Sequence, residues 1–324
     1  RFVRRTLHLH SAVENRLIHA AAKNGGLGIF SFLENIPRIL LSRIRKIIAC
    51  PDFEFLKASE SVQFVIAKLT KLECPKSRTQ DSTFGQGLRQ CEEDSASNAW
   101  MRYPPPFWSG YEYNAAHQLR TNSLPTRDQP GKPDHLRKCR AGCVYYESVC
   151  HILQGCPITH HARIRRHNDI MKTIDKLGKD RGYITDWEPR IRDANNELHK
   201  PDLIMVKDGV AIVVDAQVSW ESENLILAAL NKKAKYGKAP IRDVILQRYN
   251  VKDVQHMPVI VGARGIWPSI ANKEIEATLN IPVKIKRKIV TDVILWGVNI
   301  HRQFNRKTWW DPFGKFNFQK KKGI

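Results

Sequence analysis

The chain has 324 residues, of which 42% are hydrophobic and 9% aromatic, and this composition excludes an intrinsically disordered protein. It is long enough for two domains of ordinary size, and no run approaches the roughly 20 apolar residues of a membrane-spanning helix. The 53 lysines and arginines exceed the 32 aspartates and glutamates, so a formal net charge of +21 favours a polyanionic partner. The sign of the charge does not separate DNA from RNA, from an anionic membrane surface or from a merely soluble basic protein.

Residues 1–85 are predicted to be mainly helical. The first helix covers Ala12–Ala22 and is stopped by Asn24-Gly25-Gly26, whose residues tolerate positive φ. A second helix is expected over Ser31–Cys50, with Ser31 as its N-cap. A third is expected over about Phe53–Leu72, where apolar residues recur at helical spacing.

Residues 73–106 differ in composition, because serine, glutamine, glycine and aspartate are frequent and Pro104-Pro105-Pro106 ends the segment. Such a composition predicts an exposed linker, which we assign to residues 86–106. A helix with several aromatic residues is expected from about Trp108 to Arg120. This helix opens the next predicted unit, which covers residues 107–170.

The seven cysteines are an odd number, and several of them are clustered in residues 107–170. In a basic protein of a reducing, intracellular compartment, clustered cysteines favour metal binding over a disulfide framework. Cys139, Cys143, His151 and Cys156 have the spacing C-x3-C-x7-H-x4-C. Three thiolates and one imidazole complete the tetrahedral shell of Zn²⁺, with Zn–S distances of about 2.3 Å. The pattern therefore predicts a small zinc knuckle, and the plain alternative is four side chains that lie close only in sequence.

The choice of ligands and the role of the zinc stay open at this point. A zinc ion that only staples a small domain explains the pattern as well as one that positions nucleic acid. Neighbouring side chains that could replace a ligand are Cys150, His160, His161 and His167. Nucleic-acid contact is expected of the basic residues around the cluster, which are Arg137, Lys138 and Arg140.

Residues 171–306 are predicted to form an α/β domain. Leu203–Val206, Val210–Val218 and Met257–Val261 are short apolar runs with the length and the β-branched content of strands. Lys207-Asp208-Gly209 between the first two is a tight-turn signal, so these two runs are expected to form a hairpin. Helices are predicted at Glu221–Tyr236, about Pro268–Leu279 and Val290–Arg306.

Two carboxylates lie at the open end of the predicted hairpin. Asp202 begins the first strand, Asp215 lies toward the end of the second, and 12 residues separate them. Antiparallel strands joined by a short turn place these two ends together. A pair of carboxylates there suits Mg²⁺, which polarises a phosphate and lowers the pKa of a bound water. In the alternative, Asp202 caps a turn and Asp215 faces water at a strand edge.

One feature of restriction-type nucleases is missing from this hairpin. Those enzymes normally carry a lysine two residues after the second acid, where this sequence has Gln217. The following predicted helix offers a substitute, because helical spacing places Lys232, Lys235 and Tyr236 on adjoining parts of one face. Lys233 is a further candidate, and the sequence does not choose among the three lysines.

Residues 307–324 form a basic and aromatic tail. Lys307, Trp309 and Trp310 are expected to contact nucleic acid, because aromatic rings stack on bases and lysines contact phosphates. A solvated tail whose aromatic residues dock on the core is the alternative. The chain begins with Arg1-Phe2-Val3, without an initiating methionine, so we expect the sequence to be a fragment of a longer protein.

Five segments carry a resemblance to a known family: Ala20–Ile29, Leu119–Thr126, the three-cysteine, one-histidine cluster, Lys200-Pro201-Asp202-Leu203, and Lys232–Tyr236. Together they resemble the C-terminal region of non-LTR retrotransposon proteins with a restriction-like endonuclease, of the R-two type that inserts into ribosomal RNA genes. The segments occur in the family's order and cover nearly the whole chain. Their order is more specific than any one of them, since short motifs of common residues recur by chance.

The resemblance implies an α+β fold with a mainly helical N-terminal region, a small zinc knuckle, and an α/β restriction-like nuclease domain of the PD-D/E-x-K type. It implies that Asp202 and Asp215 bind Mg²⁺ and that the displaced catalytic lysine corresponds best to Lys232, with Lys235 and Tyr236 as further candidates. It also implies a reverse transcriptase upstream. No Phe/Tyr-x-Asp-Asp polymerase motif occurs in this sequence, so we expect that catalytic core to lie outside it.

The function implied by the resemblance is site-specific nicking of target DNA. The nick would lie in ribosomal RNA genes, in the nucleus, and its 3′-hydroxyl would prime reverse transcription of the element's own RNA. The partners would be target DNA, element RNA and the upstream polymerase domain, with no membrane. Two rivals are a non-catalytic zinc-knuckle module that binds nucleic acid, and a coat-like structural protein, against which the paired acids argue.

Overall fold

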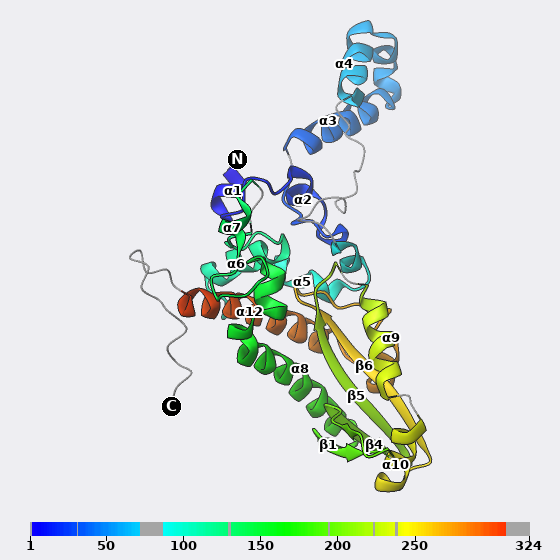
Figure 1. The fold of residues 1–324 in the computed structure, drawn as a ribbon. Coiled ribbons are helices and arrows are strands. Elements are labelled where there is room, and N and C mark those ends of the chain that lie inside the picture. Colours follow the sequence, from blue (N-terminus) through cyan, green and yellow to red (C-terminus); the bar gives the residue numbers. More distant parts are fainter. Residues whose placement is uncertain are drawn as a thin grey trace.

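The computed structural model describes residues 2–30, 32–71, 87–128, 131–193, 195–222, 224–236 and 239–308. Figure 1 shows a mixed β-sheet flanked by long helices at one end of the molecule, and a helical pair, α3 and α4, that projects from the opposite end. Over the described ranges, every helix is too short or too polar to cross a bilayer.

The N-terminal helices are shorter than predicted. α1 spans Phe2–Thr6, α2 covers only Asn15–His19, and a 3-10 turn at Ala22–Asn24 replaces the end of the predicted first helix. α3 spans Phe32–Ile48, close to the second predicted helix. Its predicted N-cap, Ser31, lies outside the described residues.

The third predicted helix is broken in two. Ser59 is extended, with φ of −69° and ψ of 116°, and separates a 3-10 segment at Pro51–Ala58 from α4 at Glu60–Lys71. The break lets the chain reverse so that α4 packs back against α3, as Figure 1 shows. Apolar spacing alone did not reveal it, because the periodicity continues across the break.

The segment predicted as an exposed linker is folded over the part that the structure describes, and this prediction is wrong for residues 88–102. Leu88, Cys91 and Trp100 are fully buried. The buried Arg120 guanidinium donates to Cys91 Sγ at 2.8 Å and to Asn98 Oδ1 at 3.0 Å, and it also reaches a backbone carbonyl of this segment. The elements here are Leu88–Glu92 (3-10), Ser95–Ser97 (3-10), α5 at Ala99–Arg102 and α6 at Gly110–Arg120.

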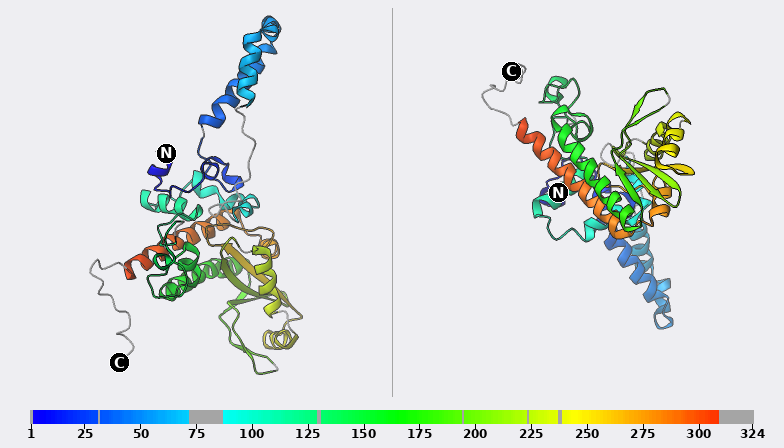
Figure 2. Two further views of the ribbon diagram at one scale, coloured as in Figure 1. Left: turned by 45° about the horizontal axis from the view of Figure 1, so that its top comes forward. Right: turned by 90° about the horizontal axis from the view of Figure 1, so that it is seen from below.

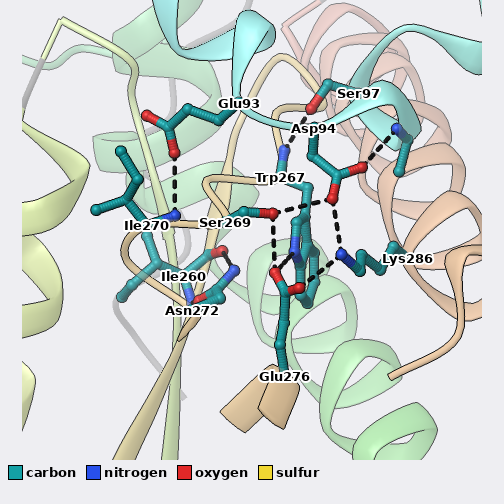
Figure 3. A network of polar contacts seen from close by, with 11 residues as sticks. Glu93, Asp94, Ser97, Ile260, Trp267, Ser269, Ile270, Asn272, Glu276 and Lys286 are labelled. Atoms are coloured by element: carbon teal, nitrogen blue, oxygen red, sulfur yellow. Dashed lines mark hydrogen bonds and ion pairs between the residues drawn. The ribbon is translucent and has the colours of Figure 1, made fainter. Parts of the chain in front are cut away.

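A polar network joins this segment to the C-terminal part of the chain, and Figure 3 shows it closely. Lys286 Nζ lies 2.7 Å from Asp94 Oδ2 and 2.6 Å from Glu276 Oε2. Ser269 Oγ donates to the same Asp94 oxygen at 2.9 Å, and Trp267 Nε1 donates to Glu276. We call Asp94, Ser269, Glu276 and Lys286 the Lys286 clasp.

The main sheet has four strands in the order β1-β4-β5-β6. β4 and β5 form the predicted antiparallel hairpin, β1 pairs antiparallel with β4, and β6 runs parallel to β5. A separate two-stranded sheet pairs β2 with β3. The strands span Ile184–Trp187 (β1), Ile191–Arg192 (β2), Leu198–His199 (β3), Leu203–Lys207 (β4), Val210–Ser219 (β5) and Asp253–Gly262 (β6).

Helices cover both faces of the four-stranded sheet, because successive residues of its strands point to opposite faces and are apolar on each. Leu203 and Val214 pack in the larger core with α8 and α12, whereas Ile204 and Val213 pack in a second core with α9 and α10. Figure 2 shows the two helix layers on either side of the sheet. The helices span His160–Asp180 (α8), Leu225–Tyr236 (α9), Ala239–Tyr249 (α10) and Val283–Lys307 (α12).

The sequence did not predict α8, and the structure corrects the domain boundary drawn between residues 170 and 171. That boundary falls inside α8, whose first turns follow the cysteine cluster and whose later turns pack on the sheet. The two predicted units therefore share one continuous helix. α12 also begins earlier than predicted, and the remaining helix of this region, α11, is shorter than predicted at Lys273–Leu279.

Candidate acid-pair and metal sites

The β4–β5 hairpin brings the two predicted acids together. Its turn uses Asp208 and Gly209 with φ of 50° and 75°, the left-handed conformations that a two-residue hairpin turn requires. The resulting register pairs Leu203 with Val214, so the preceding Asp202 lies beside Asp215. Asp202 Oδ2 also accepts a hydrogen bond of 2.7 Å from Ala216 N, which fixes it against the neighbouring strand.

Asp215 is a buried carboxylate, with only 6% of its surface exposed. Lys232 from α9 forms an ion pair with Asp215 Oδ1, and Lys235 Nζ lies 3.6 Å from Asp215 Oδ2. Helical spacing puts both lysines on the face of α9 that meets the sheet. Burying an ionised aspartate without such partners costs free energy. The lysines of α9 supply the positive charge that Asp215 of β5 needs.

The structure also separates the three candidate lysines by their contacts. Lys233 points away from the acid pair and binds Glu274 of α11, with Nζ 2.7 Å and 2.8 Å from the two carboxylate oxygens. Gln217, which stands where restriction-type nucleases have a lysine, donates to Ser219 Oγ at 2.7 Å. Of the three lysines, Lys232 therefore lies closest to the acids, and Lys235 is the next closest.

Tyr236 closes this side of the site. Its hydroxyl donates to Lys200 O at 3.2 Å and accepts from Lys235 Nζ at 2.7 Å. Burial raises the pKa of Tyr236 strongly, and the nearby charge of Asp215 raises it further. The phenol is therefore a hydrogen-bonding group and not a phenolate.

His167 of α8 is a further member of the site, which the sequence suggested only as a substitute zinc ligand. Its Nε2 lies 2.9 Å from Asp202 Oδ2, away from the cysteine cluster. The hydrogen bond to Asp202 raises the pKa of His167. Burial opposes ionisation of Asp202, but the contacts with His167 outweigh it and the pKa of Asp202 is lowered.

A sequence signal for His167 existed in the pattern of α8. His167 precedes Ile170, Met171 and Ile174 at spacings of three, four and seven residues, and those three side chains are fully buried. A histidine in the apolar stripe of a helix needs a buried hydrogen-bond partner, which here is Asp202. Without a prediction of α8, this stripe was not visible.

The predicted zinc ligands form one compact group. One ligand atom each from Cys139, Cys143, His151 and Cys156 lies within 4.8 Å of all the others, and Cys143 Sγ is 3.9 Å from Cys156 Sγ. His151 Nε2 is buried and has no hydrogen-bond partner among the described residues. Burial, together with the neighbouring thiols, raises the pKa of Cys139 to about 12. Three thiols beside an unpartnered imidazole nitrogen fit Zn²⁺, whose binding would deprotonate them.

The alternative ligands stay outside this group in the part of the chain that the structure describes. Cys150, His160 and His161 are not members of it. The cluster lies between the short helix α7, at Asp134–Arg137, and α8. A π-helical turn at His151–Gly155 and a 3-10 turn at Pro157–Thr159 connect the last two ligands to α8.

The basic residues around the cluster make internal contacts. Arg137 donates to Asp128 at 2.6 Å and 2.9 Å, and Arg140 donates to the buried Glu147 at 2.9 Å. Lys138 donates to Val144 O at 2.9 Å. These bonds tie the metal-binding loops together, and nucleic-acid contact by these three residues stays a prediction.

The predicted tail residues are described only in part. Lys307, in the last turn of α12, donates to Ile158 O at 3.3 Å, and Ile158 is close in sequence to Cys156 of the cysteine–histidine group. Trp309 and Trp310 lie outside the described residues. The prediction that these three residues bind nucleic acid is therefore untested.

Comparison with known proteins gives the family of the chain that carries this mixed sheet, acid pair and cysteine–histidine cluster. The chain is 36% identical over 319 residues to a "Retrovirus-related Pol polyprotein from type-1 retrotransposable element R2" of Popillia japonica, covering 94% of this chain and 66% of the relative. A second such protein of Popillia japonica is 34% identical, with 95% of this chain and 71% of the relative covered.

A more distant relative extends the comparison to another insect. The Pol polyprotein "from type-2 retrotransposable element R2DM" of Drosophila melanogaster is 28% identical over 85% of this chain and 28% of its own length. A scan against protein-family models gives no match. The chain belongs to the R2 retrotransposon Pol polyprotein family. It spans between 44% and 71% of the length of the four Popillia japonica relatives that it matches.

Proposed function

We propose that residues 171–306, together with α8, form a Mg²⁺-dependent DNA endonuclease whose site consists of Asp202, Asp215 and Lys232. The observation that carries the proposal is the meeting of three charged groups from separate elements. The hairpin register sets Asp202 beside Asp215, and α9 adds Lys232 to the buried Asp215. Adjacent carboxylates repel one another, so a fold that holds two of them together at a buried site favours a bound cation.

The donor set suits a hard metal ion. Asp202 and Asp215 offer carboxylate oxygens, which Mg²⁺ prefers, and they would hold it. The ion supplies Lewis acidity, which polarises the scissile phosphate and makes a bound water more acidic.

The chain's own residues have distinct parts in the proposed reaction. Lys232 lies where its ammonium group would neutralise charge on a phosphate beside Asp215. His167 positions Asp202 through Nε2. Tyr236 holds Lys235 against the site and joins α9 to the Lys200 carbonyl.

The proposed biological role follows from the family. The nuclease would nick target DNA in ribosomal RNA genes in the nucleus, and the 3′-hydroxyl would prime reverse transcription of element RNA by a polymerase domain upstream in the polyprotein. Zn²⁺ held by the cysteine–histidine cluster would staple the loops that lead into α8. Because α8 also carries His167, this staple would help to set the acid pair.

The test is nicking of supercoiled plasmid that carries ribosomal DNA, with Mg²⁺ added. Asp202→Asn should lower the nicking rate by about a hundredfold or more, because it removes a metal ligand and the partner of His167. Asp208→Asn is the matched control, since it changes an aspartate of the same hairpin at a left-handed turn position that asparagine tolerates. Both variants should bind duplex DNA as the wild type does.

A second candidate function is nucleic-acid binding without cleavage, which the compact metal-ligand group favours because its four ligands include none of the acid-pair residues. Duplex binding by the wild type with no Mg²⁺-dependent nicking would support this candidate. Nicking that persists in Asp202→Asn would show that the acids are wrongly assigned.

A further inference from the structure

A cluster of aromatic rings packs against the inner side of the loop between α5 and α6. Trp100 is fully buried, and its ring centroid lies 5.8 Å from Trp108, 6.4 Å from Tyr113 and 5.0 Å from His117. Tyr113 OH donates to Met101 O at 2.9 Å and so ties α6 to the end of α5. The loop of residues 103–109 is therefore held at both ends, at its C-terminal end by Trp108 as well.

Local hydrogen bonds make the same loop stiff. Trp108 N donates to Pro105 O at 3.0 Å, which closes a turn. Ser109 caps α6 with a complete capping box, in which Glu112 accepts from Ser109 N at 2.7 Å and Ser109 Oγ accepts from Glu112 N at 3.2 Å. A loop fixed in this way presents its outward side chains in a set position before any partner arrives, which lowers the entropic cost of binding.

Three large aromatic side chains lie on the outward side of this ordered segment. Tyr103 is 67% exposed, Phe107 is 68% exposed and Tyr111, in the first turn of α6, is 54% exposed. Isolated exposed apolar residues are ordinary, but three exposed aromatic rings within nine residues are a local concentration of apolar side chains. The inner ring cluster holds this loop in place, so its exposed rings are suited to binding a partner.

Arginines accompany these rings and indicate the chemistry of the partner. The Arg302 guanidinium of α12 lies 4.6 Å from the Tyr111 ring centroid, and the Arg102 guanidinium lies 5.7 Å from that of Tyr103. Arg306, one turn beyond Arg302 on α12, is exposed. Glu112, the neighbouring acid, is engaged by Ser109. Exposed rings with arginines beside them offer stacking to bases and charge to phosphates.

We propose that Tyr103, Phe107 and Tyr111, with Arg102 and Arg302, form a stacking surface for single-stranded DNA. The partner is unpaired because bases within a duplex are stacked on one another and leave no faces for the rings. The choice of DNA rests on the proposed function, because a nicked strand can unpair from its new end. Arg302 comes from α12, whose buried residues share one hydrophobic core with β4, β5 and β6.

The experiment measures fluorescence anisotropy of a labelled oligodeoxynucleotide of about 12 nucleotides, within the site sizes of single-strand binders. The same sequence as duplex DNA and as single-stranded RNA forms the other two arms, and all titrations use the full chain without Mg²⁺. The triple variant Tyr103→Ala, Phe107→Ala, Tyr111→Ala should raise the Kd for single-stranded DNA at least about tenfold, since each stacked base contributes a comparable factor. The Kd for duplex DNA should not change.

Phe64→Ala is the matched control, because Phe64 is also 68% exposed and has Lys68 6.0 Å from its ring centroid, but lies on the projecting α4. It should leave all three Kd values unchanged. Tyr111→Phe keeps the ring and should bind like the wild type, whereas Arg302→Gln should weaken binding and flatten its dependence on salt. A melting temperature equal to that of the wild type shows that each variant is folded.

Three outcomes would overturn the proposal. An unchanged Kd for single-stranded DNA in the triple variant would show that the three rings do not bind it. An equal loss of duplex binding would show that the surface does not select unpaired strands. Tighter, ring-dependent binding of the RNA arm would overturn the assignment to DNA. Failure of the nuclease proposal is separate, because it appears as absent nicking by the wild type and leaves these Mg²⁺-free titrations intact.

Discussion

The acid pair and the Lys286 clasp contain the same chemical groups in two different arrangements. Each has two carboxylates and a largely buried lysine from a helix, with 20% of the Lys232 side chain exposed and 9% of the Lys286 side chain. The acid pair has a second, more exposed lysine, Lys235. In the clasp, one lysine lies between two acids that come from different elements. At the acid pair, the two acids lie side by side, and the lysines gather on only one of them.

The difference lies in how the charges are arranged. In the clasp, Asp94 receives hydrogen bonds from Lys286 and Ala96 N, and Glu276 receives them from Lys286 and Trp267 Nε1. Ser269 has a single hydroxyl hydrogen, and its Oγ lies 2.9 Å from an oxygen of either acid. The acid pair instead sets two carboxylates side by side, with Lys232 and Lys235 against Asp215 and His167 against Asp202. A lysine fixed between two acids joins separate elements of the fold, whereas two adjacent carboxylates offer their oxygens together to a metal ion.

The largest expected effect is a loss of folding stability when the Lys286 clasp is broken. Lys286→Met should lower the free energy of unfolding by about 3–5 kcal/mol, because it leaves the largely buried side chains of Asp94 and Glu276, 11% and 19% exposed, without their cation. Urea unfolding followed by circular dichroism measures this loss. The nicking rate per folded molecule should stay at the wild-type level.

Lys288→Met is the control for this prediction, since Lys288 lies on the same helix with 53% of its side chain exposed. It should cost less than about 1 kcal/mol, as exposed ion pairs do. An equally small effect of Lys286→Met would show that the clasp does not hold residues 88–102 in place.

The next effect should appear in activity. Lys232→Gln should lower the Mg²⁺-dependent nicking rate by about a hundredfold, comparable to the loss of one donor that stabilises a transition state. Lys233→Gln, one residue away but bound to Glu274, should nick like the wild type. Single-turnover nicking of plasmid DNA compares them, and equal losses in both variants would contradict the separate roles of the two lysines.

The contrast between the regions also explains what the sequence predicted. The hairpin and the proximity of Asp202 to Asp215 depend on contacts within a dozen residues, an apolar strand pattern and an Asp-Gly turn, all of which a sequence displays. The cysteine–histidine group was predicted for the same reason, because its four ligands lie within 18 residues. Local spacing was sufficient in both cases.

The remaining features depend on long-range contacts. Residues 88–102 have the composition of a linker, yet Arg120 and Lys286 satisfy their polar groups from as far as 192 residues away. His167 meets Asp202 across 35 residues through a helix that the sequence did not predict. No local pattern encodes such pairings, and the choice of Lys232 over Lys233 likewise needed the position of Glu274.

The smallest expected effect concerns the pH dependence of the clasp. Burial opposes ionisation of Asp94, but hydrogen bonds from Lys286, Ala96 N and Ser269 outweigh it, so the pKa of Asp94 lies below its ordinary value of 3.8. A carboxyl group whose pKa is lower in the folded state stabilises the fold above the unfolded pKa and loses that contribution as the pH falls through the folded value. Asp94→Asn should therefore cost about 2 kcal/mol at pH 7, a loss typical of hydrogen bonds to a charged group.

The difference in unfolding free energy between wild type and Asp94→Asn should stay constant at any pH well above 3.8 and shrink below it. Urea unfolding at a series of pH values measures it, and other acids titrate in both proteins and cancel in the difference. A difference that does not change with pH would mean that the Asp94 charge is not what Lys286 holds. The clasp would then owe its stability to packing alone, and its contrast with the acid pair would disappear.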